Sequence, residues 1–256
     1  VIRTMSRSLF RRIALAALAA PLALTLAACG DKGADAGGLS GDPIAKVAPP
    51  AGKAWTDVVE KTPEGGYRMG NPEAPIKVVE FGSLTCSHCA EFAHQSAAEL
   101  GPVFVASGRV SYEFRNFVRD PIDITAAQLT RCGPPEAFFA LTEQVFGYQP
   151  QIFEKAQAAG NPAFEAAAAQ PEDKRGVAIA QLTGLTDFFA SRGISVDQAN
   201  ACLADGAAAR ALAEGQEKAG KEFDITGTPT FIINGQKAEL NTLAELKARL
   251  ETMGAR

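Results

Sequence analysis

A strand that leads directly into a Cys-x-x-Cys motif and a helix constrains this chain more than any other feature. Residues 76–84, IKVVEFGSL, are largely β-branched and apolar and end at a turn, which is typical of a buried strand. Residues 86–104, CSHCAEFAHQSAAELGPVF, place apolar side chains at helical spacing. Cys86 and Cys89 therefore lie where the predicted strand ends and the predicted helix begins.

A second strand and then a long helical segment are predicted after this motif. Residues 109–118, RVSYEFRNFV, alternate in polarity and are rich in aromatic side chains, so they predict a second strand. It should run parallel to the first strand because a helix connects the two. Residues 121–206 are Ala-rich, helical in pattern and almost without strand signals. We interpret them as an inserted lobe of several short helices.

An α/β pattern returns towards the C-terminus. Residues 207–223 predict a helix and residues 230–233 a strand, and the Asn-Gly pair that follows is a strong signal for a two-residue hairpin turn. Thr242 and Glu245 form the capping-box pattern at the start of a last helix. The predicted fold class is therefore α/β with an inserted α-helical lobe.

The N-terminal residues predict export. Four arginines and no acidic residue precede Asp31, and residues 13–28 are apolar apart from Thr25. A basic start, a short apolar run and small residues at its end are typical of a secretory signal peptide. The run ends in LAAC, which resembles the lipobox of bacterial lipoproteins and implies a lipid on Cys29. The alternative is a plain secreted protein that is cleaved near Ala28 and keeps Cys29 as a thiol.

Composition shifts then divide the rest of the chain. Residues 30–54 are rich in Gly, Ala, Pro and Asp without apolar periodicity, which indicates a flexible tether. The net charge of −4 and the absence of a basic stripe after the predicted signal peptide argue against nucleic acid as a partner. The predicted organisation is a lipoprotein signal peptide (1–28), a flexible tether (29–54), the first part of the α/β domain (55–120), the helical insertion (121–206) and the second part of the α/β domain (207–256).

The five cysteines predict two disulfides. If Cys29 carries lipid, four cysteines remain, an even number in an oxidising exported compartment. Cys86 and Cys89 are close enough to pair with each other, which leaves Cys132 for Cys202. Zinc is the alternative partner of a Cys-x-x-Cys motif, but it usually takes four ligands from two short-spaced pairs, and this chain has no second such pair. We therefore expect no metal site.

The order of these elements resembles a known fold. Strand, Cys-x-x-Cys, helix and strand, followed much later by Thr-Pro, a hairpin and a last helix, are similar to the thioredoxin fold. The helical block between the two halves resembles the DsbA-like thiol:disulfide oxidoreductases. The resemblance covers roughly residues 69–253, and its most specific parts are VVEFGSLTCSHCAEF and GTPTF. The dipeptide between the cysteines is Ser-His where the best-known member has Pro-His, which leaves the direction of electron transfer open.

The motif also predicts roles for individual residues. A cysteine at a helix N-terminus faces unpaired N–H groups and the positive end of the helix dipole, which favour the thiolate. We therefore predict Cys86 as the nucleophile and Cys89, one turn further in, as the resolving cysteine. His88 should add a hydrogen bond or a positive charge beside the Cys86 thiolate, unless it is merely a solvated loop residue. The resemblance implies that Pro229 is cis and that Thr228 faces the substrate.

Two further predictions concern residues away from the motif. The resemblance implies that Glu80 is a buried acid that assists proton transfer from the resolving cysteine. A carboxyl in an apolar strand should have a raised pKa, unless it pairs with a lysine such as Lys77 or reaches solvent. A disulfide between Cys132 and Cys202 would close a loop of about 70 residues around most of the insertion, which indicates a structural bond. The alternative is a second redox pair.

These observations predict a periplasmic thiol:disulfide oxidoreductase, anchored to a bacterial membrane through Cys29. It would exchange the Cys86–Cys89 disulfide with cysteines of exported client proteins, as an oxidase that donates disulfides, and the disulfide would make a small cofactor unnecessary. A membrane redox partner is implied by the resemblance alone, and we expect a monomer. The alternatives are a disulfide reductase or isomerase and, from a different class, a non-catalytic lipoprotein binding module or chaperone with an inert Cys86–Cys89 bond.

Overall fold

A six-stranded mixed sheet with helices on both faces organises the computed structural model, which describes residues 41–256. The predicted signal peptide, Cys29 and the first part of the predicted tether lie outside the described residues. The strand order is β1-β2-β4-β3-β5-β6. The strands are β1 (Val59–Lys61), β2 (Tyr67–Gly70), β3 (Ile76–Gly82), β4 (Val110–Asn116), β5 (Thr230–Ile233) and β6 (Gln236–Ala238).

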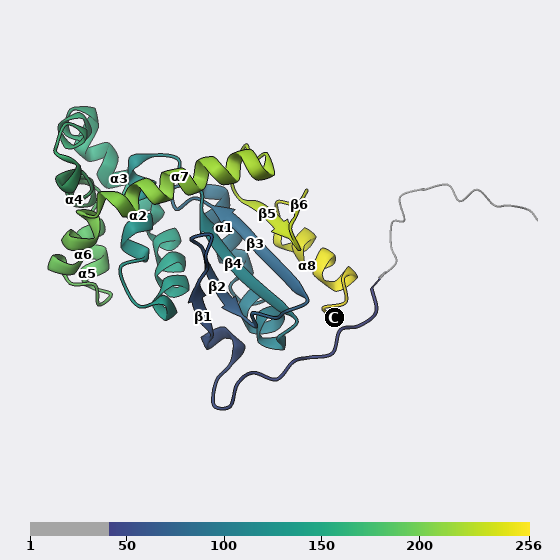
Figure 1. Ribbon diagram of the computed structural model, residues 1–256. Coiled ribbons are helices and arrows are strands. Elements are labelled where there is room, and N and C mark those ends of the chain that lie inside the picture. Colours follow the sequence, from purple (N-terminus) through teal and green to yellow (C-terminus); the bar gives the residue numbers. More distant parts are fainter. Residues whose placement is uncertain (1–40) are drawn as a thin grey trace, which may run out of the picture. The chain divides into compact units, whose positions relative to one another are not determined.

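Helices α2 to α6 form a lobe beyond one end of the sheet, and α7 leads from this lobe back to the strands (Figure 1). The helices are α1 (Ser87–Ser96), α2 (Pro121–Thr130), α3 (Phe138–Ala168), α4 (Glu172–Leu182), α5 (Leu185–Ala190), α6 (Val196–Leu203), α7 (Gly206–Phe223) and α8 (Leu243–Thr252). This arrangement confirms the predicted α/β fold with a helical insertion. Among the described residues, none of the helices is both long enough and apolar enough to cross a bilayer.

The local predictions around the motif are confirmed. β3 pairs in parallel with β4, and the helix between them is α1. β5 and β6 form the predicted hairpin, with positive φ at Asn234 (49°) and Gly235 (79°), as a two-residue hairpin turn of this type requires. Thr242 and Glu245 form a complete capping box at the start of α8. The hairpin turn and the capping box depend on neighbouring residues in the sequence, which is why pattern alone predicts them.

Strand β3 separates two hydrophobic clusters because its side chains alternate between the faces of the sheet. Ile76 and Val78 point into the main core, which also contains Cys89, Phe92 and residues of the helical lobe. Phe81 points to the opposite face and packs with residues of and near α7. Glu80 shares the face of Ile76 and Val78, so its carboxyl is directed into the main core.

The helical insertion shares the main core instead of forming one of its own. Phe138 at the start of α3 stacks on Tyr67 of β2 with ring centroids 4.0 Å apart. Phe114 of β4 contacts both Phe138 and Phe146 of α3, each at a centroid distance of 6.1 Å. The position of the insertion relative to the sheet is therefore determined by buried aromatic contacts, each of which adds to the energy of burial.

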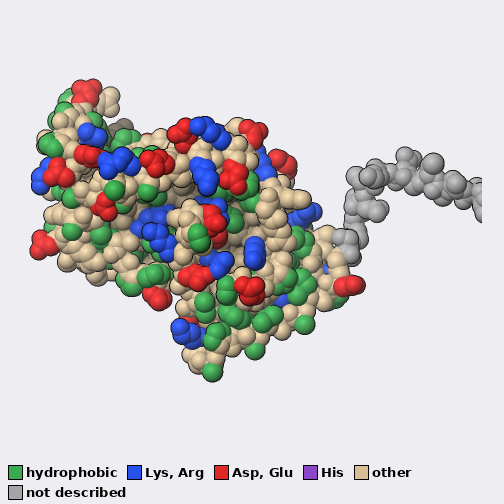
Figure 2. All heavy atoms as spheres, viewed as in Figure 1, with side chains coloured by type: hydrophobic (Ala, Val, Ile, Leu, Met, Phe, Trp, Pro, Cys, Tyr) green, Lys and Arg blue, Asp and Glu red, His purple; other side chains and the backbone are tan. Residues whose placement is uncertain are grey.

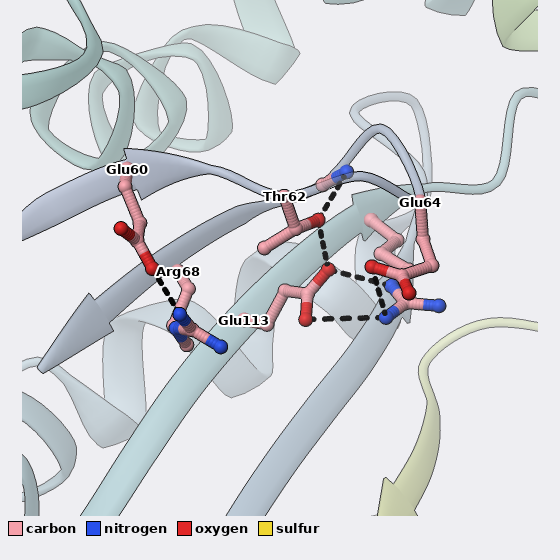
Figure 3. Close-up of polar contacts among 7 residues, drawn as sticks. Glu60, Thr62, Glu64, Arg68 and Glu113 are labelled. Carbon is pink, nitrogen blue, oxygen red and sulfur yellow. Dashed lines mark hydrogen bonds and ion pairs between the residues drawn. The ribbon is translucent and has the colours of Figure 1, made fainter. Parts of the chain in front are cut away.

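The β1–β2 hairpin was not predicted from the sequence. β1 and β2 are only three and four residues long, and polar contacts connect them to β4. Thr62 donates to Glu113 of β4 over 2.6 Å, and Arg115 pairs with Glu113 over 2.7 Å, while Arg68 pairs with Glu60 across the hairpin (Figure 3). The hairpin is stabilised by partners far away in the sequence, which no local pattern records.

The end of the predicted tether is part of the folded domain. Within residues 41–47, Gly41 and Ile44 donate backbone hydrogen bonds to residues near the C-terminus, and Val47 donates to Ser107. The indole N–H of Trp55 donates to the carbonyl of Val47 over 2.7 Å. Residues 41–47 of the predicted flexible tether are therefore hydrogen-bonded to the folded domain, and composition does not reveal these long-range backbone bonds.

Candidate active site

Cys86 is the N-cap residue of α1. Its backbone is extended (φ −91°, ψ 121°), and the helix begins at Ser87, as the sequence predicted. Cys86 is 4 % exposed and Cys89 is fully buried, so Cys86 is the more accessible of the two cysteines. Even so, the surrounding residues cover most of the Cys86 side chain. Both cysteines are free thiols in this structure, which therefore represents the reduced form.

The environment of the Cys86 sulfur favours the thiolate. The Cys89 thiol and the Thr228 side chain hydrogen-bond to it, and the backbone N–H groups of His88 and Cys89 face it. These hydrogen bonds, of which the one from the Cys89 thiol is the largest contribution, lower the pKa of Cys86 to about 4 against the effect of burial. A thiol with such a pKa is ionised at neutral pH and is a good leaving group in disulfide exchange.

Cys89 has the opposite properties. Its hydrogen bond to Cys86, its burial and the nearby Glu80 carboxyl raise its pKa far above that of an ordinary thiol, while the backbone N–H of Ser83 opposes this effect. Cys89 therefore holds its proton in the reduced protein. The two cysteines of the motif are divided into a thiolate and a proton-holding thiol, as expected for a nucleophile and a resolving cysteine.

The loop before β5 lies against the nucleophile. The Thr228–Pro229 bond is cis, which confirms the prediction for Pro229. The Thr228 carbonyl oxygen contacts the Cys86 sulfur, although 142 residues separate them in the sequence. The buried Thr228 hydroxyl is directed to the same sulfur and favours the thiolate. This loop is therefore in direct contact with the Cys86 sulfur.

Glu80 is buried, as predicted, and its partner is a tyrosine instead of a lysine. The residue is 1 % exposed, and the Tyr112 hydroxyl donates to its carboxyl over 2.7 Å. Burial raises the pKa of Glu80 to about 8, with the Tyr112 hydrogen bond opposing and the Cys86 charge reinforcing the shift. Glu80 also lines a small cavity of about 130 Å³ between α1, α3 and β4. A carboxyl that is largely protonated at pH 7 next to Cys89 can exchange a proton with that thiol.

Replacing Glu80 with glutamine should make stability less dependent on pH. The pKa of Glu80 is higher in the folded than in the unfolded state. The free energy of unfolding therefore falls as the pH rises from the ordinary pKa of a carboxyl group to about 8. Glutamine cannot ionise, so between pH 5 and pH 7 we expect the variant to gain about 2–3 kcal/mol relative to the wild type. Urea unfolding of both reduced proteins at the two pH values measures this gain. Parallel pH profiles would show that Glu80 is ionised at a normal pKa.

The other predicted site residues fall into two groups. The His88 side chain is exposed and makes no hydrogen bond with any residue of 41–256, while its backbone N–H faces Cys86. Cys132 and Cys202 form a disulfide with Cα atoms 5.9 Å apart, between the end of α2 and α6. Within the described residues, no cluster of three or more His, Cys, Asp or Glu side chains could hold a metal ion.

Sequence reasoning missed a set of side chains that surround the turn between β3 and α1. The carboxyl of Asp123 in α2 accepts the Ser83 hydroxyl over 2.6 Å and the Leu84 backbone N–H over 2.8 Å. The amide nitrogen of Gln149 in α3 donates to the carbonyl oxygens of Leu84 (2.8 Å) and Cys86 (3.0 Å). The Asp-Pro pair before α2 could have predicted a helix start, but no local signal places these side chains at the motif.

A hollow larger than the cavity beside Glu80 lies away from the motif. A groove of about 630 Å³ lies between α7, α2 and the edge of the sheet, and no residue that lines it belongs to the cysteine motif or the Thr228–Pro229 loop. Basic side chains such as Lys61 and Lys218 alternate there with acidic ones such as Glu64 and Glu222. Figure 2 shows the same mixture of charges on the face that carries α7. On that face the charge pattern has no extended basic stripe of the kind that binds nucleic acid.

Comparisons with known proteins agree with this geometry. The Thioredoxin family model matches residues 62–252. The solved protein-disulfide isomerase from Novosphingobium aromaticivorans is 35% identical, with a TM-score of 0.67 over 72% of this chain and 95% of that one. Wolbachia pipientis alpha-DsbA1 is similar in fold, with 22% identity and a TM-score of 0.57 over 73% of this chain and 89% of that one.

Curated relatives show the same relationship at lower identity. A Rickettsia bellii protein, provisionally named a protein-disulfide oxidoreductase, is 25% identical over 76% of this chain and 66% of its own length. A Rickettsia prowazekii protein with the same provisional name is 25% identical over 72% of this chain and 60% of its own length. The chain thus matches slightly less than two thirds of the length of these relatives.

Proposed function

The chain belongs to the thioredoxin family, and from this premise we propose that it is a DsbA-like thiol:disulfide oxidoreductase that donates disulfides to exported client proteins. One observation carries the proposal. The Cys86 sulfur lies at the N-terminus of α1, accepts hydrogen bonds that hold it as a thiolate, and is paired with the proton-holding Cys89. Stabilising the thiolate stabilises the reduced form, and a stable reduced form makes the corresponding disulfide an oxidant.

The reaction follows from this division of roles. A client thiolate attacks the Cys86 sulfur of the Cys86–Cys89 disulfide, a client–Cys86 bond forms, and Cys89 leaves as a thiolate that takes a proton from Glu80. A second client thiolate then attacks the client sulfur of the mixed disulfide and releases Cys86 as a thiolate. The client loses two electrons and gains a disulfide, and the enzyme is left as the dithiol. A membrane redox partner with a more oxidising disulfide would restore Cys86–Cys89.

The structure suggests how a client would be held. The nearly buried Cys86 sulfur is bounded by the Thr228–Pro229 loop, so a client cysteine must approach across that loop. The backbone of Thr228 and of the loop around it offers hydrogen-bonding groups to an extended client segment. Unfolded or reduced chains fit this site better than folded ones because they can adopt an extended conformation.

We further propose that the protein acts in the periplasm, anchored to a membrane by lipid on Cys29. The proposal rests on the basic and apolar N-terminal residues and on the LAAC motif. In cells that export the protein, Cys29→Ala should move it from the membrane fraction to the soluble periplasmic fraction. If the wild type fractionates as soluble, the anchor is absent and the protein is secreted in a free form.

The reduction potential of Cys86–Cys89 tests the direction of transfer. We expect a value nearer to about −120 mV, as DsbA shows, than to about −270 mV, as thioredoxin shows, when the purified protein is equilibrated with glutathione. A potential near the thioredoxin value would make the protein a reductase. A bond that stays oxidised below about −300 mV would be structural, and the protein would then be a binding module or chaperone instead of an enzyme.

Isomerisation is the second candidate function, and one observation favours it. The 35%-identical solved structure from Novosphingobium aromaticivorans is described as a protein-disulfide isomerase. An isomerase must break wrong disulfides as well as form new ones, so it works from the reduced state. Recovery of activity from a client with scrambled disulfides, added to the reduced protein without oxidant, would support isomerisation over simple donation.

A further inference from the structure

The turn between β3 and α1 is held from outside by the helical insertion. Ser83 and Leu84 are fully shielded from solvent, and this turn determines where α1 begins and therefore where its N–H groups point. Two side chains reach it from different helices of the insertion, Asp123 from α2 and Gln149 from α3. They are 0 % and 5 % exposed, so neither is available for any role on the surface.

Asp123 holds the N-terminal half of the turn. Its carboxyl accepts three hydrogen bonds, from the Ser83 hydroxyl (2.6 Å), the Leu84 N–H (2.8 Å) and the Arg119 N–H (3.0 Å). The Arg119 side chain also donates to the Ser83 hydroxyl oxygen over 2.9 Å. The backbone N–H of this same Ser83 faces the Cys89 sulfur. Asp123 is therefore connected to the resolving thiol through a single residue, Ser83.

Gln149 holds the C-terminal half. Its amide group donates to the carbonyl oxygens of Leu84 and Cys86. One side chain therefore bonds both to the turn before the motif and to the predicted nucleophile. The Cys86 carbonyl also accepts the Ala90 N–H over 3.1 Å, whereas Gln149 is the donor to the Leu84 carbonyl among the described residues. Without Gln149 the buried Leu84 carbonyl would be unsatisfied, and such a group would be expected to rotate or to admit water. Either change would move the first turn of α1 relative to the Cys86 sulfur.

We propose that Asp123 and Gln149 are positioning residues, through which the helical insertion holds the turn of residues 83–86 and so maintains the reactivity of Cys86 and Cys89. Neither side chain contacts the sulfur atoms or a client. They act by keeping the N–H groups of Ser83, His88 and Cys89 aimed at the two sulfurs. The geometry stands by itself, while its importance for turnover rests on the proposed redox function.

The test measures the Cys86 thiolate directly in the reduced full-length protein. The rate of alkylation by iodoacetamide is followed against pH, and mass spectrometry locates the label on Cys86. Gln149→Leu keeps a buried branched side chain but lacks both N–H donors, and we expect it to raise the Cys86 pKa by about one unit, which is a tenfold loss of thiolate below that pKa. Asp123→Asn replaces an acceptor of three hydrogen bonds and should act in the same direction.

Two controls separate positioning from other effects. Gln144→Leu changes an exposed glutamine of the same helix, and Ile179→Ala destabilises the same lobe by a cavity without contacting the turn; both should leave the Cys86 pKa unchanged. If Asp123 acted only through its charge, Asp123→Asn would lower the Cys86 pKa, which contradicts the proposal. Folded Gln149→Leu and Asp123→Asn proteins with the wild-type pKa would also overturn it.

The outcome is distinguishable from failure of the proposed function. If wild-type Cys86–Cys89 does not exchange with glutathione, the oxidoreductase proposal fails, whatever the variants show. If the wild type exchanges and the Gln149→Leu potential becomes less oxidising along with the raised Cys86 pKa, both proposals hold. If the wild type exchanges and neither quantity changes in the variants, only the positioning role is excluded.

Discussion

Cys86→Ser should lower the rate of client oxidation by at least about a thousandfold, to the uncatalysed background. Serine keeps the N-cap position and the shape of the site but cannot form a disulfide. The expected loss is therefore chemical, and circular dichroism should show an unchanged fold. Oxidation of a reduced client, followed by counting its free thiols over time, provides the measurement.

Cys89→Ser is the matched variant because it changes the same motif one helical turn away. It retains the Cys86 thiolate but has no thiol to resolve a mixed disulfide. We therefore expect it to react with oxidised glutathione or with an oxidised client and to accumulate the covalent adduct, visible as a shift on non-reducing gels. The assignment of nucleophile and resolving cysteine would be contradicted if the Cys86→Ser variant formed the covalent adduct instead. It would also be contradicted if both variants exchanged disulfides at the wild-type rate.

The sequence predicted the parts of the site that depend on local pattern. Cys86 at the start of α1, the hairpin turn after β5 and the Thr242–Glu245 cap are each specified by a few consecutive residues, so patterns of turns and caps predict them well. The cis bond at Pro229 was predicted by resemblance and is confirmed. The burial of Glu80 was implied by the same resemblance and is also observed.

The parts that the sequence did not predict depend on long-range contacts. Tyr112 as the partner of Glu80 follows from the register of β3 against β4, and Asp123 and Gln149 reach the motif only because the insertion packs on the sheet. The short β1 and β2 strands have too few residues for a clear period and gain their stability from β4. In each case the partner lies about 30 residues or more away in the sequence, beyond the reach of any local pattern.

The Cys132–Cys202 disulfide should contribute about 4 kcal/mol to stability, because it closes a loop of 70 residues and restricts the unfolded chain. Cys132→Ala/Cys202→Ala should therefore lower the thermal midpoint by about 8–16 °C in a domain of this size. The comparison is best made in a Cys86→Ser/Cys89→Ser background, so that the redox state of the motif does not contribute. Thermal unfolding by circular dichroism measures the difference.

The same bond also bears on the active site. It connects α6 to the end of α2, the helix that carries Asp123, and Gln128 of α2 donates to the carbonyl oxygens of Cys202 and Asp205. If the Cys132–Cys202 bond is structural, it should resist reduction down to about −300 mV. Its removal should then leave thiol–disulfide exchange by Cys86–Cys89 intact. If Cys132–Cys202 instead titrates near the potential of the motif, it is a second redox pair, and the insertion takes part in electron transfer. A midpoint that hardly changes in the Cys132→Ala/Cys202→Ala variant would show that the packing of α2 against α3, α4 and α6 is sufficient to hold this helix, and with it Asp123, in place.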